Sequence, residues 1–93
     1  MTPEEIFNEV SATLTARFSH TLTTLFKPVL RQLPGVWEQC VNASNAVENQ
    51  DEEQLSDVLH ELDELVSDHG YGYGFAFEDL EYRLQLVIRH AKG

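Results

Sequence analysis

Apolar residues recur at spacings of three and four along most of this chain, which is the period of an amphipathic helix. The opening Thr2-Pro3-Glu4-Glu5 has the residues of a capping box, with proline in the first turn. The apolar stripe that follows consists of Ile6, Phe7, Val10, Leu14, Phe18, Leu22 and Leu25. This pattern predicts a helix over about 3–26, which Pro28 kinks or restarts and which continues to residue 33.

The length of this first helix conflicts with the size of the chain. A helix over 3–26 would measure about 36 Å. A compact chain of 93 residues has a radius of gyration near ~12 Å and a diameter of roughly 30 Å. Either the helix breaks near its middle, or the molecule is elongated, or two copies associate along the apolar stripe. The sequence leaves these three alternatives open.

Two further helices are predicted on either side of a turn at Asn49-Gln50. Pro34-Gly35 ends the first segment, and a helix over 36–48 then buries Val36, Trp37, Cys40, Val41 and Val47. Asp51 and Gln54 form another capping box, which starts a helix over 51–69. The apolar residues of this helix lie within about 120° of one helical wheel. They are Leu55, Val58, Leu59, Leu62, Leu65 and Val66.

A last helix is predicted over 77–91. Glu78 and Asp79 lie in its first turn and Arg89 near its end, as the helix dipole favours. Its apolar stripe is Phe77, Leu80, Leu84, Val87 and Ile88. Because no segment alternates with the period of a strand, we expect an all-α fold. The expected architecture is a small bundle of three to four helices in one domain over 1–93.

The charge of the chain is strongly one-sided. It has 16 acidic residues against six lysines and arginines, a net charge of −10. The 51 residues from Gln32 to Tyr82 contain 13 of these acids and no lysine or arginine. Such a field favours a basic protein partner or a cation and disfavours direct contact with nucleic acid.

The acids concentrate on the predicted helix over 51–69. Nine acids in the 21 positions from Glu48 to Asp68 give one acid per about 3.5 Å of helix axis, close to the ~3.4 Å per phosphate of one DNA strand. The residues that we expect to contact a basic partner are Glu53, Asp57, Glu61, Glu64 and Asp68. The alternative is a solvated outer face that only keeps the protein soluble. The absence of compensating lysines four residues away favours a function in binding.

An aromatic segment follows this helix. Gly70-Tyr71-Gly72-Tyr73-Gly74-Phe75 has acids on both sides, which excludes stacking on single-stranded bases. Tyr71 and Tyr73 are either interface anchors or side chains that pack back on the bundle. Tyr82 lies opposite the apolar stripe of the last helix, where it adds to a second strip with Leu86 and Arg89. This strip is either a dimer or partner surface, or a second contact within the bundle.

Metal-dependent chemistry is the third alternative. The pairs Glu61/Glu64 and Glu78/Glu81 resemble the acidic motifs of all-α nucleotide pyrophosphatases, which bind magnesium. However, Glu61 and Glu64 lie opposite the apolar face of their helix, and no basic residue nearby would meet a triphosphate. Asp57 and His60 lack the second such pair that a di-iron site needs. We therefore predict no cofactor, no metal and no catalytic residue.

The resulting hypothesis is a small, acidic, non-catalytic protein that occupies a basic surface of another protein. A nucleic-acid-mimic inhibitor, an antitoxin or an immunity-type neutraliser would have this size and charge. The competing hypotheses are a structural or assembly subunit, which could form a homodimer through its apolar faces, and the magnesium-dependent hydrolase. Cys40 lies on an apolar face and is expected to be inert. With no apolar run long enough for a bilayer and no basic leader, we expect a cytoplasmic protein.

Overall fold

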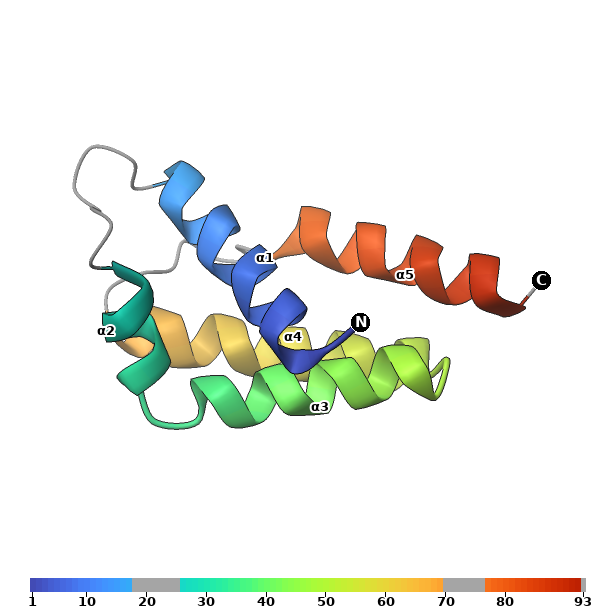
Figure 1. Cartoon of the computed structure of the whole chain (residues 1–93), viewed down its shortest axis with the longest axis horizontal. Helices are drawn as coiled ribbons and strands as arrows, with labels where there is room; N and C mark the ends of the chain where they lie inside the picture. Colours follow the sequence, from blue (N-terminus) through green and yellow to red (C-terminus); the bar gives the residue numbers. More distant parts are fainter. Residues whose placement is uncertain (18–25, 70–76, 93) are drawn as a thin grey trace.

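The computed structural model describes residues 1–17, 26–69 and 77–92, and these form five α-helices and no strand (Figure 1). The helices are α1 (Pro3–Arg17), α2 (Phe26–Gln32), α3 (Val36–Glu48), α4 (Glu52–Asp68) and α5 (Glu78–Lys92). The predicted all-α bundle is confirmed. None of the described helices is long and apolar enough to cross a membrane.

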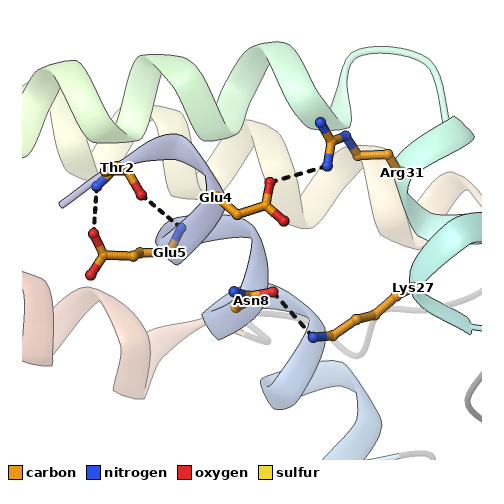
Figure 2. A network of polar contacts seen from close by, with 6 residues as sticks. All are labelled: Thr2, Glu4, Glu5, Asn8, Lys27 and Arg31. Atoms are coloured by element: carbon orange, nitrogen blue, oxygen red, sulfur yellow. Dashed lines mark hydrogen bonds and ion pairs between the residues drawn. The ribbon is translucent and has the colours of Figure 1, made fainter.

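The structure describes α1 over Pro3–Arg17, residues 18–25 of the predicted helix lie outside the described residues, and α2 packs against α1. Lys27 Nζ donates to Asn8 Oδ1 at 3.1 Å, and Arg31 pairs with Glu4 at 3.2 Å (Figure 2). In one continuous helix these partners would be about 28 Å and 40 Å apart. Helix α2 therefore runs antiparallel to α1, and the two are not parts of one straight helix. The apolar period did not reveal this arrangement, because it has the same spacing in both segments.

Local signals set the helix starts. Thr2 and Glu5 form the predicted reciprocal capping box, with hydrogen bonds of 3.0 and 3.2 Å (Figure 2). Asp51 Oδ1 accepts from the backbone N–H of Gln54 at 3.0 Å and caps α4. Gly35 precedes α3 with φ of 84°, a conformation that glycine adopts without a Cβ penalty. A Cβ there would also approach Leu65 Cδ1 to 3.2 Å.

The centre of the bundle is the antiparallel pair of α3 and α4, which lie side by side along the long axis (Figure 1). Helices α1 and α5 pack against this pair. The buried core draws on every described helix and consists of Ile6, Phe7, Val10, Leu14, Leu30, Val36, Cys40, Ala43, Ala46, Val47, Leu55, Val58, Leu59, Leu62, Val66, Phe77, Leu80, Leu84 and Ile88. The predicted apolar faces therefore form one continuous core.

Four residues of the predicted apolar faces are not buried. Trp37, Val41 and Leu65 are only half-buried, and Val87 is 43% exposed. In their place Ala43 and Ala46 are fully buried, because small side chains allow α3 to lie close to its neighbours. The molecule measures 41 × 22 × 21 Å with a radius of gyration of 12.7 Å. It is thus elongated, which is one of the alternatives that the sequence left open.

Candidate binding surface

Five acidic side chains form a row on the outer face of α4. Glu53, Asp57, Glu61, Glu64 and Asp68 are all exposed. At 3.6 residues per turn they fall within an arc of about 80°, and they extend over about 22 Å of helix. The buried side chains of α4 lie on the other side of the helix. We call these five residues the acidic stripe.

The acidic stripe receives no ion pair from the part of the chain that the structure describes. The three ion pairs between arginines and acids in the described residues join Arg31 to Glu4, Arg83 to Glu9 and Arg89 to Glu52, at 3.2, 2.9 and 3.0 Å. Each of these pairs connects two helices and involves an acid outside the stripe. These arginines therefore pair with acids outside the stripe, and none of them offsets the negative charge of the stripe.

Other acids near α4 have structural partners. Glu52 accepts two hydrogen bonds from Arg89 of α5, and Asp51 caps the helix. A histidine on the same helix also has a contact within α4, since His60 Nδ1 lies 2.8 Å from the carbonyl oxygen of Ser56. Hence the nine acids counted between Glu48 and Asp68 are not equivalent, because Asp51 and Glu52 have contacts within the protein, whereas the five carboxylates of the stripe are exposed.

The stripe has an energetic cost for the isolated protein. Its members are three or four residues apart, and like charges at these spacings destabilise a helix by about 0.2–0.5 kcal/mol for each pair. Four such neighbours along the stripe cost on the order of 1–2 kcal/mol. A helix selected only for stability would carry both acidic and basic residues on its outer face, because unlike charges at these spacings are stabilising.

The predicted aromatic anchors lie partly outside the described residues. Tyr71 and Tyr73 fall within 70–76, which the structure does not describe. Tyr82 is 59% exposed on α5, and Leu86 beside it is half-buried. Arg89, the third member of the predicted strip, is held by Glu52. The outer face of α5 therefore offers one large exposed aromatic side chain.

The carboxylate pairs that resemble a pyrophosphatase motif do not converge. Glu61 and Glu64 belong to the exposed stripe, whereas Glu81 is half-buried on α5 and one of its oxygens is fully buried. Among the described residues, no three His, Cys, Asp or Glu side chains lie close enough together to hold a metal ion. The positions of these carboxylates do not favour a magnesium site.

Cys40 is fully buried in the core, and burial raises the pKa of its thiol to about 12. The thiolate is the reactive form, so the folded protein should be almost inert toward thiol reagents near neutral pH. We expect labelling by a disulfide reagent to proceed at the rate of opening of the bundle and to become fast in denaturant. Rapid labelling of the native protein would contradict the buried position.

A groove that the sequence did not reveal lies where the first residues of the chain meet the carboxyl ends of α3 and α5. It has a volume of about 500 Å³ and is open to solvent. Met1 and Glu5 line one side, Val47 and Glu48 a second, and Val87 a third. Ser44 Oγ of α3 donates to the Met1 carbonyl oxygen at 2.5 Å and fixes the chain end beside it.

No protein-family model, curated protein or solved structure matches this chain. What the protein does must therefore be inferred from its own surface, charges and packing.

Proposed function

We propose that this protein is a small, non-catalytic binding protein whose acidic stripe occupies a basic surface of a partner protein. The observation that carries the proposal is the row of five exposed carboxylates without an ion pair in the described structure, beside three arginines that pair with other acids. The proposed role is that of a nucleic-acid-mimic inhibitor, an antitoxin or an immunity-type neutraliser.

The rigidity of α4 supports this role. The stripe lies on a helix whose opposite face is buried in the core, so the carboxylates keep their spacing of about 4.5–6 Å along the axis. A preformed surface loses less conformational entropy on binding than a flexible acidic tail. Charges on an exposed surface mainly accelerate association and select partners, so an apolar contact must contribute much of the affinity. Tyr82, together with Tyr71 and Tyr73, is the predicted apolar contact.

A second candidate function is an assembly subunit that binds through apolar helix faces, including another copy of itself. The exposure of Tyr82 at 59% and Val87 at 43% favours it. In that case the acidic stripe would serve solubility alone, and association would not depend on salt.

The salt dependence of partner binding distinguishes the two candidate functions. The protein is immobilised, a cell lysate is applied at low ionic strength, and the column is washed with rising salt. We expect the specific partner to elute by a few hundred millimolar salt, as the screening length falls below ~10 Å. Retention that is unchanged at about 1 M salt, where the screening length is about 3 Å, would contradict the proposal and favour the assembly subunit.

A further inference from the structure

The groove between α1, α3 and α5 has a lining that is partly apolar and partly acidic. Val47, Val87, Ala91 and Met1 contribute apolar surface, and Val87 and Met1 are 43% and 38% exposed. Glu5 and Glu48 line the same groove, and both carboxylate side chains are exposed. Such a combination suits a ligand that is apolar along its length and charged at its tip.

The electrostatics of the groove favour a positive charge. Glu5 and Glu48 line the groove and no basic side chain of the described residues does, and α3 ends at Glu48 with a partial negative charge beside it. The last turn of α5 carries Arg89, His90 and Lys92, which offset the partial charge of that helix end, and none of the three lines the groove. The amino end of α1 has the opposite partial charge, but Thr2 and Glu5 cap it. The backbone and side-chain hydrogen bonds from Thr2 lower the pKa of Glu5, which keeps this carboxylate ionised and in place.

We infer that this groove receives one lysine or arginine side chain of the partner protein. The aliphatic stem of that side chain would lie on Val47, Val87 and Ala91, and its charged head would reach Glu5 and Glu48. Lysine and arginine both bury their methylene groups on apolar surface while the head stays near water and carboxylates. Charge complementarity and the mixed lining together identify this occupant.

The groove and the acidic stripe are close in the sequence, at the turn between α3 and α4. Gln50 lines the groove, and Glu53, the first residue of the stripe, follows three positions later. Because a chain spans at most about 3.6 Å per residue, Glu53 lies within roughly 11 Å of Gln50, and one basic partner can contact both. The inference thus rests on the proposed function and adds a defined anchor to it. The stripe accelerates the encounter, and the groove slows dissociation by burying one side chain.

A single-residue probe tests the groove without any partner. Amide NMR spectra are recorded while N-acetyl-lysine methylamide is added at an ionic strength of about 0.15 M, with N-acetyl-norleucine methylamide as the uncharged control. We expect saturable shifts at Val47, Glu48 and Val87 with the lysine probe, and binding of the norleucine probe weaker by about fivefold. Shifts that do not saturate, or that spread evenly over α4, would overturn the inference.

Matched variants assign the effect to the groove. Glu48→Gln should weaken the lysine probe by about threefold, and Glu38→Gln, an exposed acid at the other end of α3, should leave it unchanged. Reversal of the stripe at Asp57, Glu61 and Glu64 should also leave the probe unchanged. These variants therefore distinguish a failure of the inference about the groove from a failure of the proposed binding role of the stripe. Equal binding by Glu48→Gln and the unaltered protein would contradict the assigned site.

A bulky residue tests the groove in the complex. Ala91 is exposed, so Ala91→Trp should fill the groove without unfolding the bundle. For the partner that elutes with salt, we expect a Kd about tenfold weaker and a dependence on salt that remains steep, because the stripe is unaltered. An unaltered Kd with the groove filled would overturn the inference, even if the stripe variant loses binding.

Discussion

Replacing Leu62 with alanine is expected to lower the free energy of unfolding by about 2–5 kcal/mol, a large part of the roughly 5–14 kcal/mol typical of a domain this size. Leu62 is fully buried at the centre of α4, where it packs in the core shared with α3. The lost methyl groups leave a cavity that the surrounding helices fill only partly. Urea unfolding followed by circular dichroism measures the change from the midpoint at a constant slope.

The matched control is Glu61→Ala, which alters the neighbouring residue on the exposed stripe. Because Glu61 has like charges three and four residues away and no ion pair in the described structure, its removal should change stability by less than about 0.5 kcal/mol. A loss above about 1 kcal/mol in the control would show that Glu61 has a structural partner, contrary to its assignment to the stripe. A small effect of Leu62→Ala would contradict the packing of α4 in the core.

Reversing the charge of the stripe is expected to slow association with the basic partner by between about tenfold and a thousandfold at low salt. The change is Asp57→Lys, Glu61→Lys and Glu64→Lys together. Each of these side chains is exposed, so the variant should keep its helical content and fold. Stopped-flow or surface-based kinetics on the partner retained at low salt measure the association rate.

A second triple variant separates the position of the charge from its total amount. Glu38→Lys, Glu78→Lys and Asp79→Lys change the net charge by the same amount at exposed positions of α3 and α5. We expect this variant to associate within about threefold of the unaltered protein. Equal slowing by both variants would mean that total charge, rather than the stripe, governs association.

The α4 helix shows what the sequence could predict. Its bounds were predicted as 51–69 and are 52–68, with Asp51 as the N-cap. Apolar period, cap and turn all agreed there, and such agreement among local signals is the best basis for a prediction. The exposure of Glu53 and Asp57 followed from their place opposite the apolar face.

The antiparallel packing of α2 on α1 and the groove show where the sequence was insufficient. Arg31 of α2 contacts both neighbouring helices, since its guanidinium lies 3.6 Å from the centre of the Trp37 ring and pairs with Glu4. The groove joins Glu5, Glu48 and Val87 from three helices. Both features arise from tertiary packing between residues far apart in the chain, which no local period or motif encodes.

The salt dependence of the Kd for the retained partner, compared between the unaltered protein and the stripe variant, tests the central claim most directly. We predict that affinity of the unaltered protein falls by at least about tenfold between low and physiological salt, because the stripe is attracted to a basic surface. For the variant with lysine at positions 57, 61 and 64, the dependence should become much flatter. The same steep dependence in both proteins would contradict a role of the acidic stripe in binding.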